Sequence, residues 1–329
     1  MLVLGIESTA HSFGVGIVEE RGGKARILAN ELSKYPSTRA GYIPRKLVEF
    51  HSKHFLKTIE DALEKADVGL NELSAVAYSY GPGIGHCLHF GYIVAKTLSA
   101  QLRIPLIPVN HAIAHVEIGK FCGKMKDPLT VYVSGGNTQV LALHAEKGEK
   151  RYHVFGETLD IGLGNFLDQV GRKLGLNPPD AVGVLTEAAK GKRFIQLPYT
   201  VKGMNTAFSG LLTAVEKMKG KESNVDLCYS AQETSFAMLV EATERCLCHT
   251  RNEEVLLCGG NARNKRLQEM LELMSKEQGA RFCATPPDLS GDQGAMIAYT
   301  GLLMLKHNAV PKNTEPNQKV RIDSQEISW

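Results

Sequence analysis

Leu2-Val-Leu-Gly-Ile-Glu7 is an apolar run, and it is followed by the small polar residues Ser8-Thr-Ala-His-Ser12 and the alternating run Gly14-Val-Gly-Ile-Val-Glu19. An apolar strand, a short polar turn and a return strand predict a β-hairpin. The same pattern returns later in the chain, as a strand over 130–133, a turn over 134–138 and a strand over 139–144. Two copies of one pattern predict a duplicated α/β lobe with a cleft between the copies.

Helical and strand patterns fill the rest of each half. Apolar residues recur close to every 3.6 positions over 43–67, which predicts an amphipathic helix. Further helices are expected over 90–102, from 110 onward, and over 162–176, 233–250, 264–278 and 294–307, with strands over 74–79, 104–109 and 254–257. We expect an N-terminal lobe over 1–125, a C-terminal lobe over 126–307 and a surface tail over 308–329.

Composition excludes several classes of protein. Of 329 residues, 43% are hydrophobic and 22% are charged, which is typical of a folded chain and not of a disordered one. The net charge of +3 does not indicate a polybasic nucleic-acid coat. The chain has neither a run of about 18 apolar residues nor a basic leader, so we expect no membrane association and a cytoplasmic location. Seven cysteines without a CxxC pair predict reduced, mostly buried thiols.

His111-Ala-Ile-Ala-His115 is the most specific local feature. On a helix, positions four apart share one face and lie about 6 Å apart, so both imidazoles can reach one ion. Glu117 points away from that face, and the arrangement differs from the HExxH motif of zinc proteases.

Such spacings also arise without a metal. We interpret His51 and His54 as a pair on a helix surface, and His86 and His89 as a loop-to-helix pair. Asp292, in Ser290-Gly-Asp-Gln-Gly294, precedes a predicted helix and is either its cap or a carboxylate that completes a His/His/Asp site. Sequence spacing leaves both alternatives open.

Two glycine pairs resemble backbone cradles for phosphate. They lie in Ser134-Gly-Gly-Asn-Thr138 and in Cys258-Gly-Gly-Asn-Ala262. Glycine lets main-chain amides approach an anion closely, and a following helix adds its positive end. Neither turn matches the P-loop or the GxGxxG fingerprint. Five basic residues either attract a polyanion or form solvated helix faces. These residues are Lys192, Arg193, Arg263, Lys265 and Arg266.

Five longer stretches carry a resemblance to a known family. They are Val109–Gly119, Tyr132–Val140, Gly156–Asn165, Leu197–Met204 and Gly291–Tyr299. Together they resemble the universal tRNA threonylcarbamoyladenosine synthase family, the catalytic subunit of the KEOPS complex, formerly labelled O-sialoglycoprotein endopeptidase. The amino-acid sequence of these stretches most resembles the archaeal and eukaryotic branch of the family. The resemblance implies an α/β fold of duplicated ribonuclease-H-like lobes, the ASKHA class of actin, sugar kinases and heat-shock chaperones.

The resemblance also implies an activity. The family moves the threonylcarbamoyl group from threonylcarbamoyl-adenylate to the adenosine next to the anticodon in tRNAs that read ANN codons. The implied cofactor is one divalent metal ion per subunit, iron or zinc. The implied partners are tRNA and the KEOPS subunits, which include an atypical small protein kinase/ATPase, and the implied location extends to the nucleus if the source is eukaryotic.

Carried onto this chain, the family's catalytic metal ligands are His111, His115 and Asp292, with Tyr132 as a further ligand. We expect the two imidazoles of the first lobe and the aspartate of the second to bind one cation across the cleft. The implied substrate-binding residues are Tyr132, Val133, Ser134, Gly135, Gly136, Asp168, Gly183, Glu187 and Asn264. The chain departs from the family's Pro-Gly-Gly-Pro turn at 177–183, and the alternative frame puts Ala181 and Leu185 in place of Gly183 and Glu187.

Three other functions remain open from the sequence. A metallopeptidase would use the two histidines, although the glutamate of HExxH is missing. An ATP-binding kinase or ATPase could share the fold, because fold alone does not determine function. A non-enzymatic scaffold within a complex is the third alternative.

Overall fold

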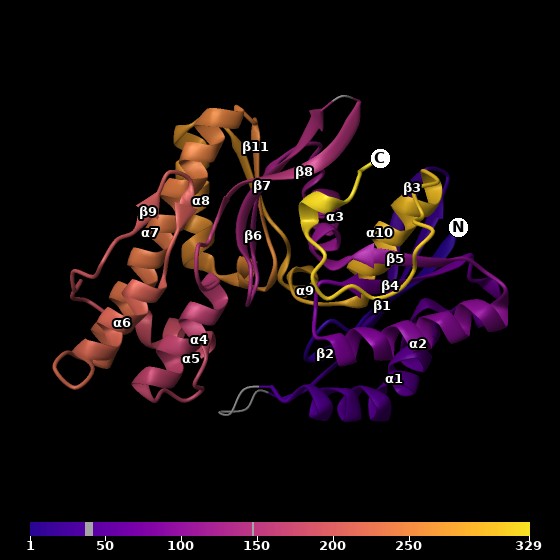
Figure 1. The fold of residues 1–329 in the computed structure, drawn as a ribbon, viewed down its shortest axis with the longest axis horizontal. Helices are drawn as coiled ribbons and strands as arrows, with labels where there is room; N and C mark the ends of the chain where they lie inside the picture. The colour runs from indigo at the N-terminus through magenta and orange to yellow at the C-terminus, as the bar shows by residue number, and fades with distance from the viewer. Residues whose placement is uncertain (37–41, 147) are drawn as a thin grey trace. The chain divides into compact units, whose positions relative to one another are not determined.

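The computed structural model describes residues 1–36, 42–146 and 148–329. The chain forms two compact units. The first unit comprises residues 1–121, 144–152 and 291–329, and the second comprises residues 122–143 and 153–290. Figure 1 labels the elements of both units.

The first unit is built on a mixed sheet in the order β3-β2-β1-β4-β5. Strands β1, β2 and β3 are antiparallel neighbours, whereas β4 and β5 run parallel to β1. The predicted hairpin is present, but its return strand is longer than expected and a third strand that we did not predict follows it. The strands are β1 Leu2–Glu7, β2 Ser12–Arg21, β3 Lys24–Lys34, β4 Ala75–Gly81 and β5 Leu106–Asn110.

Helices cover both faces of this sheet. The first unit's helices are α1 Pro44–Ala66, α2 Gly85–Leu102, α3 His111–Gly123 and α10 Gly294–Lys306, with short 3₁₀ turns η1 Leu70–Glu72 and η3 Ile322–Ser324. Leu4 and Ile6 of β1 point to the core under α1 and α2. Gly5, between them, faces α10, where an added Cβ would clash with the backbone of Ala298 and Gly294. The alternation of β1 therefore places the bulky Leu4 and Ile6 on one face and Gly5 on the other, and α10 packs closely on the face that carries Gly5 (Figure 1).

The position of α10 differs from the expected domain organisation. The sequence assigned residues 126–307 to a second lobe, but residues 291–329 belong to the first unit. Helix α10 packs on β1 and β2 because Gly5 and Gly16 have no side chains to keep it away. This long-range contact leaves no local signal in the sequence around residue 300.

The second unit contains a sheet in the order β12-β11-β6-β7-β8. Strands β6 and β7 form the predicted second hairpin, and β11 runs parallel to both β6 and β12. Residues 144–152, at the far end of the β7–β8 hairpin, are grouped with the first unit. The strands are β6 Leu129–Val133, β7 Thr138–Glu146, β8 Glu149–Glu157, β11 Glu254–Cys258 and β12 Arg281–Ala284, with a small ribbon of β9 Val201–Lys202 and β10 Asn205–Thr206.

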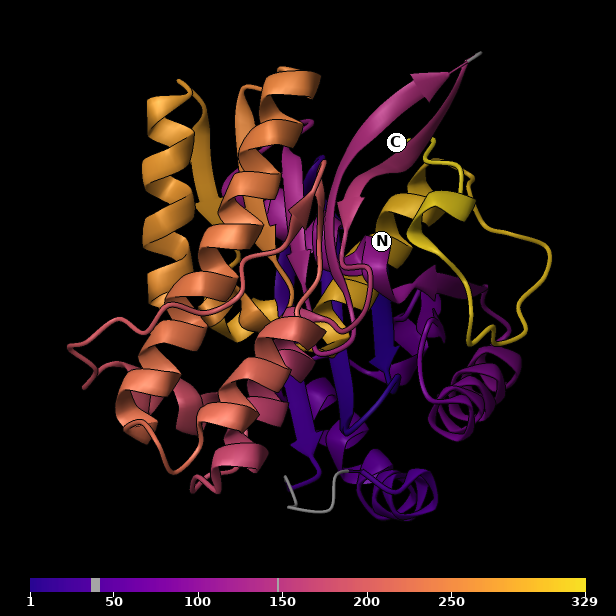
Figure 2. The same ribbon diagram turned by 60° about the vertical axis from the view of Figure 1, so that its left-hand side comes forward.

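The helices of the second unit enclose its apolar core. Helices α7 and α8 pack side by side (Figure 2). Helix α7 begins well before the predicted residue 233, as α2 begins before residue 90, and α5 and α6 were not predicted. The elements are α4 Leu163–Leu174, α5 Ala181–Ala188, α6 Ser209–Met218, α7 Asn224–Thr250, η2 Gly260–Arg263, α8 Lys265–Glu277 and α9 Pro287–Ser290.

The seven cysteines all lie in the described part of the chain, and each is a free thiol. Cys87, Cys228, Cys246 and Cys258 are buried, as the sequence predicts for most of them. Of the helices that the structure describes, none has the length and apolar character to cross a membrane.

Candidate metal centre and nucleotide site

Strand β5 runs directly into α3, and this junction positions two histidines. The Asn110 side chain caps the helix, since its Oδ1 accepts hydrogen bonds from the backbone N–H of Ala112 (3.0 Å) and of Ile113 (3.4 Å). His111 and His115, one turn apart, have ring centroids separated by 4.7 Å and ring planes nearly perpendicular. Both side chains are buried. The helical spacing therefore brings the imidazoles together as predicted.

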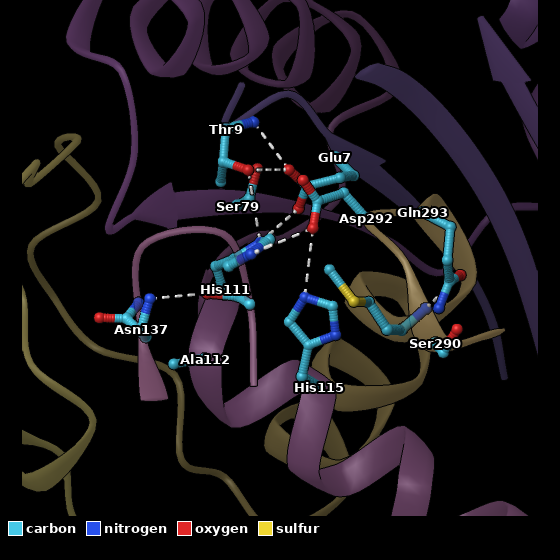
Figure 3. A network of polar contacts seen from close by, with 12 residues as sticks. Glu7, Thr9, Ser79, His111, Ala112, His115, Asn137, Ser290, Asp292 and Gln293 are labelled. Atoms are coloured by element: carbon cyan, nitrogen blue, oxygen red, sulfur yellow. Dashed lines mark hydrogen bonds and ion pairs between the residues drawn. The ribbon is translucent and has the colours of Figure 1, made fainter. Parts of the chain in front are cut away.

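Asp292, in the loop before α10, completes the cluster. Its Oδ1 lies 3.3 Å from His115 Nε2 and 3.5 Å from His111 Nε2 (Figure 3). The three potential ligand atoms lie within 4.8 Å of one another. Helix α10 is capped by Gln293, whose Oε1 accepts from Met296 N–H at 3.0 Å, so the helix-cap interpretation of Asp292 is wrong.

All three residues lie in the first unit. The prediction that these three residues bind a cation across a cleft between two lobes is therefore wrong. The packing of α10 on β1 and β2 brings Asp292 to α3 within one unit. Of the His, Cys, Asp and Glu side chains in the described ranges, His111, His115 and Asp292 are the one group found that could hold a metal ion.

The charges of this cluster favour a cation. Burial opposes protonation of His111, but the Glu7 and Asp292 carboxylates outweigh it and raise the pKa of His111 to about 9. Burial lowers the pKa of His115. The hydrogen bond to Asp292 acts in the opposite direction but is the weaker effect. Burial also acts to raise the pKa of Asp292, but His115 and the charge of His111 hold it well below its usual range. Two imidazole nitrogens and an ionised carboxylate are a donor set that suits divalent transition metals.

Glu7 also belongs to the site, although the sequence pattern indicated no role for it. It ends β1 and is fully buried, and its Oε2 lies 2.9 Å from His111 Nδ1. A charged residue at the end of an otherwise apolar strand was the available signal. Glu117 faces away from the cluster, as predicted, toward the Tyr152 hydroxyl and Lys120 Nζ.

The prediction for His51 is wrong. Its side chain is fully buried, 5.7 Å between ring centroids from Phe13 and 6.2 Å from Phe90. Helix α1 presents this residue to the core together with Leu47 and Ile59. His86 and His89 are exposed on α2, which begins at Gly85, so neither lies in a preceding loop.

The two glycine turns of the second unit lie at one edge of its sheet. They follow β6 and β11, which are parallel neighbours with Tyr132 opposite Cys258. Gly259 has φ +91°, and an added Cβ there would clash with Val133 O. At Gly136 and Gly260 an added Cβ would meet nothing within 4 Å. The turns thus have open space beside exposed backbone at the carboxyl ends of parallel strands, where α/β proteins bind ligands.

The amino terminus of α4 lies against the first of these turns. Asn165 N–H donates to Gly135 O at 2.9 Å. An added Cβ on Gly162 would lie 2.7 Å from Gly136 O, and one on Gly164 would lie 2.7 Å from Ser134 O. A helix amino terminus carries partial positive charge, so this corner favours an anion.

The other predicted substrate residues occupy neighbouring helices. Asp168 of α4 accepts from Ala181 N–H at 2.9 Å, which ties α4 to the start of α5. Gly183 is buried against Pro178 O, where a Cβ would not fit. Glu187 is half-buried and pairs with Lys190 at 2.7 Å. Tyr132 is buried in β6, in a different unit from the histidines.

Asn264 caps α8 by accepting from Leu267 N–H at 3.0 Å and lines a cavity of about 550 Å³. Residues of α5, α7, η2 and the start of α8 line the same cavity, among them Leu185, Tyr229 and Arg263. Asp168, Gly183 and Glu187 are not among its lining residues. Arg266, predicted as polyanion-binding or solvated, donates from Nε to Glu233 Oε1 at 3.0 Å and from Nη2 to Glu233 Oε2 at 2.7 Å.

Comparison with known proteins identifies the family. A family model described as "TsaD: tRNA N6-adenosine threonylcarbamoyltransferase" matches residues 26–299. The chain belongs to this family. The enzyme is 48% identical over 339 residues to the Staphylothermus marinus tRNA N6-adenosine threonylcarbamoyltransferase, covering 99% of each chain. It is 47% identical over 333 residues to the Thermococcus kodakarensis enzyme of the same name, covering all of both chains. The predicted family and activity are confirmed.

A third relative is longer. The Methanocaldococcus jannaschii protein, described as a probable bifunctional tRNA threonylcarbamoyladenosine biosynthesis protein, is 47% identical over 334 residues. The match covers all of this chain and 60% of that protein.

Solved structures with low sequence identity share the fold. HypF from T. kodakarensis superposes with a TM-score of 0.61 at 16% identity, over 94% of this chain and 48% of that one. Component A of the Acidaminococcus fermentans (R)-2-hydroxyglutaryl-CoA dehydratase gives a TM-score of 0.53 at 14% identity, over 91% and 98% of the two chains. These likenesses confirm the predicted ASKHA fold.

Proposed function

We propose that the enzyme uses threonylcarbamoyl-adenylate as its donor and modifies the adenosine next to the anticodon in tRNAs that read ANN codons. The exocyclic amine attacks the carbamoyl carbon and forms a C–N bond. The bond from that carbon to the phosphate oxygen breaks, AMP leaves, and the amine loses a proton. The donor is already activated, so positioning and charge stabilisation suffice, without a side-chain nucleophile.

The convergence of His111, His115 and Asp292 in a chain of this family is the observation that carries the proposal. We infer that they hold one divalent metal ion per subunit, iron or zinc, and we propose Tyr132 as a further ligand. When bound, the metal supplies positive charge that can polarise an oxygen of the substrate. The half-buried, ionised Asp292 carboxylate and the two Nε2 atoms beside it support this inference.

We propose that the adenylate phosphate binds to the backbone of Tyr132–Gly136, Val133 included. The open space at Gly136 and the adjacent amino terminus of α4 support this assignment. Asp168 and Glu187 would accept hydrogen bonds from nucleoside hydroxyls, and Gly183 and Asn264 would contact the nucleotide. The cavity that Asn264 lines has room for part of a nucleoside.

We propose that tRNA is the acceptor and that KEOPS subunits, including a small atypical kinase/ATPase, assist in the cytoplasm. A net charge of +3 supports few phosphate contacts, so a basic partner surface would strengthen tRNA binding. The M. jannaschii relative is described as bifunctional and extends beyond the part that this chain matches, in agreement with a second component acting with this one.

Nucleoside mass spectrometry of unmodified tRNA tests the function. With enzyme, pre-formed threonylcarbamoyl-adenylate and the divalent metal, we expect threonylcarbamoyladenosine to form. His111→Ala should reduce the rate at least about 100-fold, because the proposed charge stabilisation is lost. His89→Ala, in an exposed histidine of α2, is the matched control and should retain full activity.

Other outcomes would favour the competing functions. ATP hydrolysis without tRNA, unaffected by His111→Ala, would favour a kinase or ATPase. Peptide cleavage would favour a metallopeptidase, and undiminished tRNA modification in the His111 variant would favour a scaffold.

A further inference from the structure

A buried carboxylate lies directly behind one of the histidines of the candidate metal centre. Glu7, the last residue of β1, is fully buried. Its Oε2 lies 2.9 Å from His111 Nδ1, and its Oε1 accepts hydrogen bonds from the backbone N–H of Thr9, at 2.7 Å, and from the Thr9 hydroxyl. Figure 3 shows these polar contacts as dashed lines, which lead from Thr9 to Glu7, from Glu7 to His111 and from His111 to Asp292. All four belong to the first unit.

The two nitrogens of the His111 ring face different carboxylates. Nδ1 faces Glu7, whereas Nε2 faces Asp292 Oδ1 at 3.5 Å. A carboxylate cannot donate a hydrogen bond when ionised, so a bond to Glu7 requires the proton on Nδ1. When the ring is neutral, the form in which an imidazole binds a metal, this leaves the Nε2 lone pair directed toward the Asp292 side, where His115 Nε2 also lies.

We propose that Glu7 is a positioning residue for the metal centre. It holds the His111 imidazole as the Nδ1–H tautomer, and Thr9 holds Glu7. The inference rests on the proposed metal role of His111, His115 and Asp292. Carboxylate partners of this kind fix the ring orientation and increase the basicity of the ligating nitrogen.

A buried ion pair is the alternative role for Glu7. In that case neutralising Glu7 would change stability but would not change how the site binds a metal, since His111 would keep its place on α3. Metal affinity and the spectrum of a bound metal therefore distinguish positioning from a merely structural role.

The experiment is a Co²⁺ titration of the full chain, freed of metal, with affinity measured by chelator competition and ligand geometry by the visible d–d absorption. Glu7→Gln keeps the shape of the side chain and removes its charge. We expect it to weaken Co²⁺ binding by about 10- to 100-fold and to shift the d–d band.

Glu117→Gln is the matched control. Glu117 is also a buried carboxylate of the first unit, on the same helix as His111, but it contacts Lys120 and Tyr152. We expect Co²⁺ affinity and spectrum to equal those of the wild type. If Glu7→Gln does not fold, Thr9→Val is used, which removes the hydroxyl donor to Glu7 and should weaken Co²⁺ binding at least about 3-fold.

His115→Ala separates the two hypotheses. If the His115→Ala variant binds Co²⁺ as tightly as the wild type, the proposed metal centre is wrong, and the proposed role of Glu7 is then wrong as well. If His115→Ala loses binding while Glu7→Gln, or Thr9→Val in its place, keeps the wild-type affinity and spectrum, the metal centre stands and the role of Glu7 is overturned.

Discussion

His51 and His111 are both buried histidines of the first unit, yet their surroundings favour opposite charge states. His51 lies among phenylalanine rings, and burial lowers its pKa to about 4. His111 lies beside Glu7 and Asp292, which outweigh burial and raise its pKa to about 9. The number of histidines and their spacing do not distinguish the two. The difference comes from their neighbours, which strands β1 and β2, helix α2 and the loop before α10 supply.

The low pKa of His51 predicts a pH-dependent stability. An unfolded histidine has a pKa near 6.5. Between pH 6.5 and 4 the unfolded chain therefore binds this proton more readily than the folded chain, and stability falls as the pH is lowered, by up to about 1.4 kcal/mol per pH unit. Above pH 7 the contribution vanishes. His51→Leu removes the group, so urea unfolding should show a smaller loss of stability in the variant than in the wild type between pH 7.5 and 5. Parallel losses in both proteins would contradict the assignment.

At the scale of elements, glycines decide how helices approach sheets and ligands. Gly5 and Gly16 lie under α10, where added Cβ atoms would clash with its backbone. Gly136 faces open space beside the amino terminus of α4. The same residue type therefore serves packing in the first unit and, in our proposal, ligand approach in the second.

Gly5→Ala should destabilise the enzyme strongly, because the new methyl group meets backbone atoms of α10 that cannot rotate away. We expect the free energy of unfolding to fall by about 2–4 kcal/mol, as measured by urea denaturation. Gly210→Ala is the control, since a Cβ on this exposed residue of α6 meets nothing within 4 Å. An equal effect of both substitutions would show that the contact with α10 is not the cause.

Gly136→Ala should have the reverse pattern. The fold has room for the methyl group, so the midpoint of thermal unfolding should stay within about 2 °C of the wild type. The methyl group would occupy the space proposed for the adenylate phosphate, and calorimetry should show AMP binding weakened at least about 10-fold. Unchanged AMP affinity would remove this turn from the proposed nucleotide site.

At the scale of the whole molecule, the C-terminal segment is part of the first unit, although the sequence suggested a surface tail. Val320, Ile322 and Ile327 are buried. The carbonyl oxygen of Arg321 accepts from Asn110 Nδ2 at 3.1 Å, and Asn110 is the residue that caps α3. The segment from residue 308 onward thus supports the helix that carries both histidines.

Ile322→Ala should therefore reduce stability although it lies far from the site in sequence. Removing this buried side chain should cost about 2–4 kcal/mol. Lys319→Ala, in an exposed residue of the same segment, should change stability by less than about 0.5 kcal/mol. Denaturant unfolding of both variants checks the expectation, and a neutral Ile322→Ala would show that the segment does not stabilise the first unit.

The sequence by itself determined both hairpins, the helical pairing of His111 with His115 and the family, because strand alternation, turn residues and helical periodicity act over a few neighbouring residues. It also indicated the glycine turns after β6 and β11. Only the tertiary structure decided that Asp292 meets His111 and His115 within one unit, that Glu7 lies behind His111 and that His51 is buried. Each of these depends on contacts between segments far apart in the chain, above all the seating of α10 against Gly5 and Gly16, and local patterns do not record such contacts.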